Sequence, residues 1–578
     1  MNHRDARARK MPERTKIGCG TAALGCRLKT NAQGRQPRAA VPHFTALAAV
    51  VIFAATGCSC RDEGALPGMV LRVGIGAEPQ DLDPHQVTGQ PEHRILASLF
   101  EGLADIDLAT MKPVPAAAES WDISPDGRVY TFHMRTAARW SNGEPVTAHD
   151  FAYAWRRMLS PKLASEYAYL LYCIRGARDF NEGKADDFGT VGVRAPDDRT
   201  LEVTLDSPTP YLLAMQVHQA WFPVHRATVE KFGAMDERGT LWTRAGNHVG
   251  NGAFLLAEWQ PNDVLRVRRN PHYWNTSKVR LDGIEFYPID NQQTEERSFR
   301  AGNLDLTSTV PMHKIPIYRK AHPDLIKICP DLGTYFYRIN VTRPPFTEAR
   351  VRRALVLALN RDEIANNVLK AEESPAASLV PPNMPGYTPG ASVKYDPEAA
   401  RALLAAAGFP GGRGMGPVEI LYNSSDAHRT IAEAVQRMWR DNLGVEVRLI
   451  NQDWKVFLTA TNTLDYAVAR GGWIADVADP VNFLECFQTG VGNNRTGWSS
   501  PEYDALIHGS YLETDPAKRL ELLRQAEAIL LDESPIIPIY FYTWKFLQSP
   551  ALKGLVLNPL DHLSWTDMWL ERDTGGAP

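Results

Sequence analysis

The sequence predicts a mixed α/β fold, because strand-like and helix-like patterns alternate along most of its 578 residues. Apolar and polar residues alternate as in half-buried strands in three stretches of the N-terminal half: 70–75, 128–134 and 200–205. Helical periodicity is equally clear in five stretches: 149–159, 348–359, 396–407, 427–443 and 516–531. The strands imply sheets, and the helices are expected to cover them.

The order of elements after residue 396 indicates βαβ units. Gly408 and Gly444 directly follow two of the helical stretches and predict their C-terminal ends. Strand patterns alternate with these helices at 417–422, 445–450 and 466–470. Helices between successive strands predict that the strands share one sheet.

The length allows three or four domains at ~150 residues per domain. With 44% hydrophobic and 22% charged residues, the composition is typical of globular proteins and excludes a disordered, collagen-like or polytopic membrane chain. No internal repeat and no low-complexity linker separates the domains. This organisation favours a chain that crosses between lobes through adjacent strands, as in a hinged two-lobe protein.

The charge distribution argues against a nucleic-acid-binding protein. The whole chain carries a formal charge of −4, but residues 1–57 hold ten Lys and Arg against Asp5 and Glu13, a net +8. Subtracting +8 from −4 leaves −12 for residues 58–578. Such an acidic body lacks the basic face that phosphate contacts need, so we expect no nucleic-acid partner.

The N-terminus has the anatomy of an export signal, with the apolar run Phe44–Ala55 between a basic segment and small residues. The run is shorter than the ~20 residues of a spanning helix, and a short uncleaved anchor is the alternative. The tail ATGC (55–58) resembles a bacterial lipobox, although Ala55 stands where Leu is usual. We therefore assign 1–57 to a lipoprotein-type signal with an over-long basic start, Cys58 to lipid attachment and 58–67 to a tether.

No pattern of cysteines, histidines or glycines indicates a metal site, a disulfide scaffold or a catalytic centre. Apart from Cys19 and Cys26 in the signal and Cys58 at the lipid site, the cysteines are scattered, which favours buried free thiols: Cys60, Cys173, Cys329 and Cys486. The histidines lack ligand spacing and are expected to pack or to face solvent: His85, His93, His149, His218, His225 and His428. HExxH, GxSxG, GxxxxGK[ST] and a GxGxxG after a strand are all missing. We expect no cofactor, no metal and no catalysis.

Aromatic residues gather in the last third of the chain, at Trp454, Tyr466, Trp473, Tyr540, Phe541, Tyr542 and Trp544. Aromatic rings at strand spacing usually belong to a core, but the segment 466–480 has a further feature. Its apolar strand runs into a Gly pair and presents a cation, a ring and two anions within ten residues: Arg470, Trp473, Asp476 and Asp479. This group suits a zwitterionic ligand with apolar side chains. A loop held by internal salt bridges is an equal alternative.

Two adjoining stretches carry a family signature, AESWDISPDGRVYTFHMR at 118–135 and ARWSNGEPVTAHDFAYAWRR at 138–157. Together they resemble the signature of periplasmic oligopeptide-binding proteins, the solute-binding components of ABC peptide importers. The resemblance continues through RVRRNPHYW (266–274), 355–362, YNSSDAH (422–428) and NQDWK (451–455). It therefore covers nearly the whole exported chain.

The resemblance implies the fold of that family, a periplasmic binding protein-like α/β architecture with two hinged lobes built from three sequence-discontinuous domains. Lobe 1 would combine a main domain with an additional small domain at 103–226. The main domain would consist of 68–102, 227–332 and 544–578, and lobe 2 of 333–543. We expect the lobes to close over a ligand.

In this family the peptide lies extended between the lobes and bonds through its backbone to strand edges, while its side chains enter hydrated pockets. By motif matching, Asp476 would take the α-ammonium of the peptide. Arg470, Lys370 and His428 would be alternative cations for the α-carboxylate of ligands of different length. An unpaired buried charge costs ~3–5 kcal/mol, so an enclosed zwitterion needs both signs.

The resemblance also implies contacts with the rest of the peptide. Tyr167 would touch the ligand backbone from the small domain, and Trp454 would form a pocket wall. Four further ligand contacts are expected at Trp473, Tyr542, Gly472 and Gln90.

Three departures limit the transfer. The stretch VTG (87–89) stands where the family often has an acidic residue, which puts one polar contact in doubt. Gly333 and Ile474 match positions at which some members have two cysteines, so that bridge is missing as a pair. Thr461 and Arg338 occupy pocket positions that vary in the family, and no side-chain preference is inferred from them.

The sequence therefore predicts an extracytoplasmic, lipid-anchored, monomeric binder of oligopeptides that serves an ABC permease and has no catalysis. One alternative is a binder of the same fold for murein peptides, nickel chelates or sugars. A secreted peptidase is a further alternative, but it would need a nucleophile–base pair or a metal site.

Overall fold

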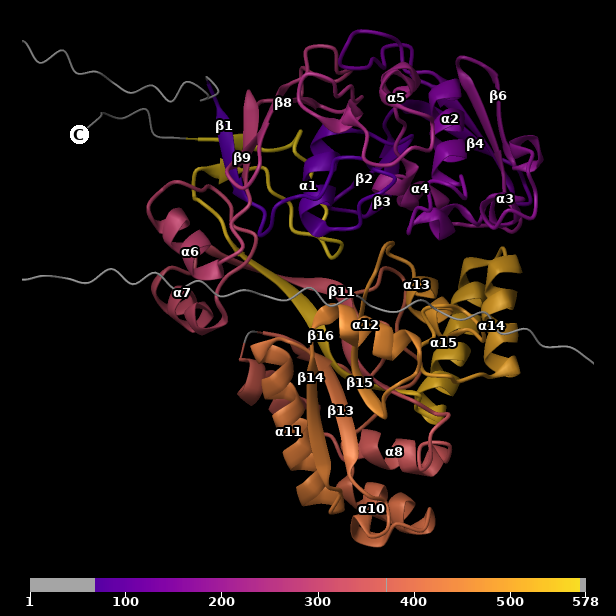
Figure 1. The fold of residues 1–578 in the computed structure, drawn as a ribbon, viewed down its shortest axis with the longest axis vertical. Coiled ribbons are helices and arrows are strands. Elements are labelled where there is room, and N and C mark those ends of the chain that lie inside the picture. The colour runs from indigo at the N-terminus through magenta and orange to yellow at the C-terminus, as the bar shows by residue number, and fades with distance from the viewer. Residues whose placement is uncertain (1–67, 371, 572–578) are drawn as a thin grey trace, which may run out of the picture. The chain divides into compact units, whose positions relative to one another are not determined.

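The computed structural model describes residues 68–370 and 372–571, without the side chains of Asp426, Trp454 and Lys455. Within this range helices and strands alternate as predicted, and three larger sheets form the framework (Figure 1). The expected signal 1–57, the tether 58–67 and the lipid site Cys58 lie outside the described residues, as does Cys60.

The first sheet joins segments that are far apart in the sequence, in the order β1-β10-β9-β8. Its strands are β1 (Val70–Gly74), β10 (Gly283–Tyr287), β9 (Val264–Arg269) and β8 (Phe254–Gln260). β1 runs parallel to β10, and the other two pairs are antiparallel. Helix α1 (Gln90–Leu99) packs against β8.

The second sheet is antiparallel, in the order β4-β5-β7-β6. Its strands are β4 (Ala118–Ile123), β5 (Val129–Met134), β7 (Thr200–Thr204) and β6 (Val193–Asp197). Alternate residues of β5 and β7 are buried, as their sequence pattern predicts. Helix α2 (Ala148–Met158), which starts with a Thr147/Asp150 capping box, packs on this sheet. One continuous hydrophobic core joins the first and second sheets.

The third sheet has six strands in the order β12-β16-β11-β15-β13-β14. They are β12 (Ser374–Pro375), β16 (Ile536–Leu547), β11 (Ile326–Ile339), β15 (Val468–Ile474), β13 (Val418–Asn423) and β14 (Val447–Gln452). β13 lies parallel to both β14 and β15, and α11 (Asp426–Leu443) connects β13 to β14. The predicted βαβ organisation is confirmed.

Helices cover both faces of the third sheet. Tyr335 and Tyr337 of β11 share a core with α8 (Ala349–Leu357), α10 (Pro397–Ala406) and α11. Phe336, between them in sequence, belongs to a second core with α14 (Pro501–Leu512) and α15 (Pro516–Glu533). Successive side chains of a strand point to opposite faces, which explains the division.

Smaller elements complete the described chain. They are β2 (Ala104–Asp107), β3 (Lys112–Pro115), α3 (Ala177–Asn181), α4 (Leu212–Met215), α5 (Arg226–Phe232), α6 (Gln292–Arg300), α7 (Ile315–Ala321), α9 (Arg361–Glu363), α12 (Trp454–Asn462), α13 (Val481–Leu484), β17 (Leu552–Lys553) and β18 (Trp569–Leu570).

The two longest strands, β11 and β16, run between the upper and lower parts of Figure 1. Their antiparallel register shifts between Pro330 and Thr334. The domain boundaries expected at 332/333 and 543/544 fall inside these two strands. The boundaries themselves stay a prediction.

The glycines predicted to end helices do so, but the Gly pair predicted to end a strand does not. Gly444, with φ +71°, caps α11, and its N–H bonds to the carbonyl oxygens of Arg440 and Trp439. β15, expected at 466–470, continues through Gly471 and Gly472 to Ile474. Both glycines have extended backbone. A Cβ would lie 2.8 Å from Arg338 Nη1 at the first and 2.6 Å from the Tyr542 hydroxyl at the second, so close packing explains the pair.

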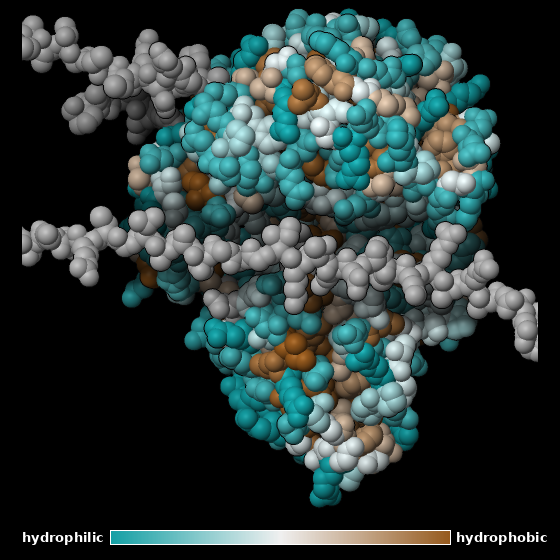
Figure 2. Space-filling view, in the orientation of Figure 1, coloured by the Kyte–Doolittle hydropathy of each residue, from teal (hydrophilic) through white to brown (hydrophobic). Residues whose placement is uncertain are grey.

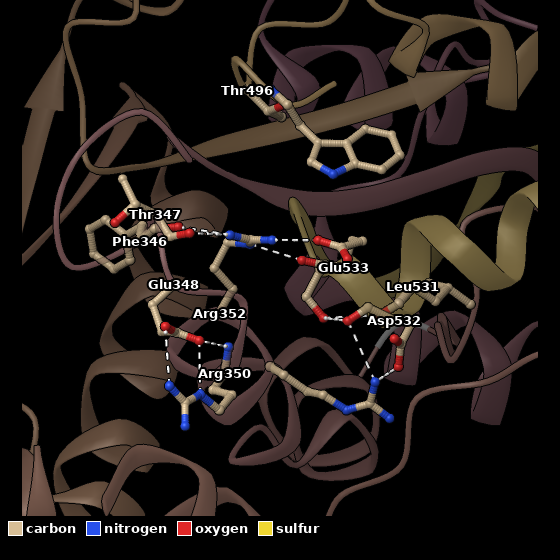
Figure 3. Close-up of polar contacts among 12 residues, drawn as sticks. Phe346, Thr347, Glu348, Arg350, Arg352, Thr496, Leu531, Asp532 and Glu533 are labelled. Carbon is tan, nitrogen blue, oxygen red and sulfur yellow. Dashed lines mark hydrogen bonds and ion pairs between the residues drawn. The ribbon is translucent and has the colours of Figure 1, made fainter. Parts of the chain in front are cut away.

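Arg352 of α8 ties this helix to the C-terminal end of α15 (Figure 3). Its Nε donates to the Glu533 carbonyl oxygen (2.8 Å) and its Nη2 to the Glu533 carboxylate (3.0 Å). Its Nη1 donates to the Phe346 carbonyl oxygen (2.9 Å). Arg350, two residues earlier, is exposed and pairs only with nearby surface groups, mainly Glu348. The buried arginine therefore fastens two helices on opposite faces of the third sheet.

The face shown in Figure 2 is largely hydrophilic, with hydrophobic atoms in separate patches. Among the described helices, none is both long enough and apolar enough to cross a bilayer.

Candidate functional site

Part of strand β15 has an edge that no other described strand covers. β11 pairs with it along Val468–Ile474, whereas β13 pairs with it only at Val468 and Ala469. The far edge of residues 470–474 therefore offers backbone N–H and C=O groups to an incoming extended chain. Side chains alternate along this edge, so Arg470 and Gly472 lie on one face of the sheet and Trp473 on the other.

Arg470 lies among tyrosines of β11 and β16. Its Nη2 donates to the Tyr542 hydroxyl (3.0 Å), and the guanidinium lies 5.3 Å from the Tyr335 ring centroid. Its Nε is buried and has no hydrogen-bond partner among the described residues. Gly472 has no Cβ, which leaves room for the Tyr542 hydroxyl. The structure thus brings three predicted site residues together and leaves Arg470 with spare donors for an anion.

His428 joins this group from α11. Its Nδ1 lies 3.4 Å from the Tyr335 hydroxyl. Burial, together with the charge of Arg470, lowers the pKa of His428 to about 4, so the imidazole is neutral at pH 7. A carboxylate bound beside it would favour the protonated, charged form. Lys370 is exposed, has φ +56° and follows the one-turn helix Ile364–Leu369, and the structure shows no contact between it and Arg470.

Asp476 lies just beyond the other end of β15, in a group of hydrogen bonds. Tyr169 donates to its Oδ2 (3.3 Å) and so does Asn482 (3.4 Å), whose Oδ1 accepts from the Trp473 indole (3.0 Å). Burial raises the pKa of Asp476 to about 6, although these two hydrogen bonds lower it. No described cation lies within ion-pair distance of this carboxylate. It is therefore a partly buried anion without a counter-ion.

Tyr167 approaches the same carboxylate from the segment 103–226. Its ring makes an edge-on contact with His218, with centroids 4.6 Å apart. Burial, followed by the negative charge of Asp476, raises the pKa of Tyr167 to about 12. Tyr167 and Tyr169 therefore place two hydroxyl-bearing rings opposite the end of β15.

Two cavities adjoin these groups. The larger, about 1270 Å³, has walls from both lobes and includes Tyr169, Trp473 and Asn482. The smaller, about 380 Å³, is lined by Gln90 at the start of α1 and by Tyr542. Peptide side chains that alternate about a strand edge would meet these two spaces in turn.

Asp479 has a structural role, which agrees with the salt-bridge alternative for this loop. Arg519 of α15 donates hydrogen bonds to both carboxylate oxygens of Asp479, at 2.8 and 2.9 Å, in a buried ion pair. The Val481 N–H also bonds to it (3.0 Å). The segment after β15 thus contains one salt bridge that holds the loop and one unpaired carboxylate.

Other expectations have mixed outcomes. Gly333 and Ile474, matched to the cysteine positions of some relatives, are direct partners in the β11–β15 register. The side chain of Trp454 lies outside the described residues. Cys329 and Cys486 are buried free thiols, whereas Cys173 is half-buried. The described residues contain no group of three His, Cys, Asp or Glu arranged to hold a metal.

Tyr169 and Asn482 were not predicted from the sequence. Tyr169 stands two residues after Tyr167 in the same aromatic segment, which was a usable signal. No sequence signal indicated Asn482, because its role comes from the turn that brings it back to Asp476 and Trp473.

Known proteins match most of this chain. Residues 112–495 match the family described as bacterial extracellular solute-binding proteins, family 5 Middle. The chain is 39% identical over 509 residues to the periplasmic oligopeptide-binding protein OppA of Escherichia coli, covering 86% of this chain and 91% of the relative.

Two solved structures are similar across nearly their whole length. Haemophilus influenzae OppA in complex with the peptide RPPGFSPFR has a TM-score of 0.74 and 35% identity, covering 87% of this chain and 99% of that one. A periplasmic oligopeptide-binding protein of an oligopeptide ABC transporter from Borrelia burgdorferi has a TM-score of 0.76 and 32% identity, covering 87% of this chain and 100% of that one. These likenesses show a periplasmic binding protein-like α/β fold.

Proposed function

The chain belongs to family 5 of the bacterial extracellular solute-binding proteins, and from this premise we propose that it captures oligopeptides outside the cytoplasm for an ABC importer. The observation that carries the proposal is Asp476, a partly buried carboxylate with no cationic partner among the described residues, at the end of an open strand edge. An enclosed anion of this kind calls for a cationic ligand group.

The ligand would lie along β15 with its α-ammonium at Asp476 and its α-carboxylate towards Arg470. At ~3.3 Å per residue, six residues place the two Cα atoms at most ~20 Å apart. An extended peptide of three to five residues spans ~10–18 Å, and the arginine side chain covers part of the rest. Tyr167 and Trp473 would flank the first residues, while His428 and Lys370 remain candidate cations for other peptide lengths.

Other parts of the proposal rest on the sequence and the family. Cys58 would carry a lipid that holds the protein at the outer surface of a membrane, and the permease of the importer would be its partner. One chain supplies the candidate contacts around both Asp476 and Arg470, which supports action as a monomer. The protein would bind its ligand without catalysis, cofactor or metal.

Two experiments test the proposal. Native mass spectrometry of the purified protein comes first, and calorimetric titration with trialanine and N-acetyl-trialanine follows. We expect co-purified masses of peptides, strong binding of trialanine and weak binding of its acetylated form. Co-purified sugars or chelates with no peptide binding would overturn the assignment in favour of another solute. Conversion of the titrant to alanine would instead indicate a peptidase.

A further inference from the structure

Arg338 is a buried cation without an anionic partner. It is 9% exposed, and its only hydrogen bond among the described residues is a long one, from Nη1 to the Arg470 carbonyl oxygen (3.4 Å). Its Nε is buried and unpartnered. Burial, with repulsion from Arg495 and Arg470 among the other causes, lowers the pKa of Arg338 to about 10. An arginine in this position is costly unless something neutralises it.

Arg495 repeats the pattern beside it. Its Nε is also buried without a partner, and burial lowers the pKa of this guanidinium. The Tyr466 hydroxyl, which lies close to both arginines, donates to the Arg495 carbonyl oxygen, and neither guanidinium makes a hydrogen bond to it among the described residues. The two side chains therefore form a cationic pair, named here the Arg338/Arg495 pair.

No described carboxylate neutralises this pair. Neither guanidinium has an acidic oxygen of the described residues within 4.0 Å. Asp465, next to Tyr466 in sequence, is bound to the exposed Arg343 (2.8 Å). The positive charge of the pair is therefore not balanced by any described carboxylate within ion-pair distance.

The Arg338/Arg495 pair lies beside the larger cavity, on the face of the sheet that holds Trp473. Arg338 and Phe336 pair with Ala469 and Gly471 of β15, and a Cβ on Gly471 would lie 2.8 Å from Arg338 Nη1. Arg495 and Trp473 line the cavity directly. The pair therefore adjoins the open edge on which a peptide would lie.

Several carboxylates also line this large cavity, and three of them are engaged elsewhere. Glu485 accepts from the Tyr511 hydroxyl (3.0 Å), Asp504 accepts from the Thr489 N–H (3.0 Å), and Glu182 pairs with Lys184 (2.5 Å). The two others are Glu166 and Asp206. Glu485 makes no ion pair with Arg338 or Arg495 within 4.0 Å, and the charges that act on it include those of Asp476, Asp479 and Arg519.

We propose that the Arg338/Arg495 pair binds the carboxylate of an acidic side chain, Asp or Glu, of the bound peptide. This inference rests on the proposed function and adds a side-chain preference to it. Because alternate residues of an extended peptide point to opposite faces, the preference is confined to the position that faces Trp473. The neighbouring position faces Arg470 and Tyr542. In the proposed function the peptide α-carboxylate already occupies Arg470, so we expect no such preference at this position.

The test compares four tetrapeptides by calorimetric titration at pH 7.5, with Glu or Gln at position 2 or at position 3 of tetraalanine. We expect Glu to bind at least tenfold more tightly than Gln at one inner position and equally at the other. Arg338→Gln removes this difference, and Arg343→Gln, which changes an exposed arginine that already has a partner, leaves it in place.

The source of the carboxylate is settled by amidated versions of the same peptides. If the Glu preference appears only when the C-terminus is amidated, the pair binds the α-carboxylate of the free peptides and the inference is overturned. Equal affinity for Glu and Gln at both positions overturns it as well, while tetraalanine binding still upholds the proposed function. Failure of tetraalanine itself to bind refutes the proposed function and this inference with it.

Discussion

Asp476 and Asp479 lie three residues apart on one loop, but their different surroundings indicate different roles. Arg519 neutralises Asp479 with two hydrogen bonds, so that carboxylate contributes to the packing of α15. Asp476 receives only uncharged donors, from Tyr169 and Asn482. Such donors orient a carboxylate without cancelling its charge, which leaves it free to pair with an ammonium group.

Replacement of Asp476 by Asn should remove recognition of a free peptide N-terminus. The substitution keeps the shape and one acceptor but leaves the ammonium without a counter-charge, at a cost of ~3–5 kcal/mol. Since ~1.4 kcal/mol is a factor of ten, we expect trialanine to bind at least a hundredfold more weakly. Calorimetry with N-acetyl-trialanine is the control, because that ligand has no ammonium to lose. Equal weakening of both ligands with a lowered Tm would mean that Asp476 only stabilises its loop.

Peptide affinity should also fall in mild acid. The pKa of Asp476 is raised to about 6, so in the free protein the carboxylate is ionised above pH 6 and protonated below it. Binding of an ammonium requires the ionised form, and at pH 5 about one molecule in eleven has it. We expect trialanine to bind about tenfold more weakly at pH 5 than at pH 8.

Glu485 provides the competing explanation for such a pH dependence, since burial raises its pKa to about 7 and its charge acts near Asp476. The Asp476→Asn variant separates the two groups. If affinity measured across pH 5–8 keeps the same slope in that variant, Glu485 or another group is responsible and Asp476 is not.

The two residues proposed for the ends of the site, Arg470 and Asp476, could be selected from the sequence because they lie within one short segment. Their partners could not be predicted in the same way. Tyr169 and Asp476 are 307 residues apart, and only the packed lobes bring them together. The sequence marked Arg338 only as a variable pocket position without a side-chain preference, since its lack of a carboxylate partner is a property of the surrounding side chains.

At the level of elements, the glycines of β15 show where a sequence pattern misleads. A Gly pair after an apolar run usually marks a turn, and the strand was expected to end before it. In the structure these residues remain in the ladder, because Arg338 and the Tyr542 hydroxyl occupy the space that side chains would need. The helices were predicted closely since their caps and periodicity are local signals.

The junction of α8 and α15 makes a matched pair of stability predictions (Figure 3). Arg352→Gln removes a buried guanidinium and leaves carbonyl groups of Phe346 and Glu533 without donors. We expect a loss of ~2–4 kcal/mol in the free energy of unfolding, measured by urea denaturation. Arg350→Gln changes an exposed side chain and should leave the unfolding midpoint within error. Equal midpoints for the two variants would contradict the role given to Arg352.

For the whole molecule, two long strands connect the proposed lobes and are expected to govern their movement. β11 and β16 are continuous through the region where the lobes meet, and their register shift between Pro330 and Thr334 interrupts regular pairing there. An interrupted ladder bends more easily than a regular one. The Tyr169–Asp476 hydrogen bond joins the segment 103–226 to the end of β15, so a peptide bound to Asp476, as proposed, would also contact the small-domain segment.

We expect bound peptide to close the lobes, because a ligand that touches both stabilises the closed arrangement by its additional contacts there. Small-angle scattering should give a smaller radius of gyration with saturating trialanine than without ligand. N-acetyl-trialanine at the same concentration is the matched control and should leave the curve unchanged, which excludes an effect of added solute. The Asp476→Asn variant should need a far higher trialanine concentration to reach the same curve. The wild-type protein could instead give identical scattering with and without ligand, while calorimetry shows that the site is saturated. Binding would then not require closure, and β11 and β16 would act as a rigid connection.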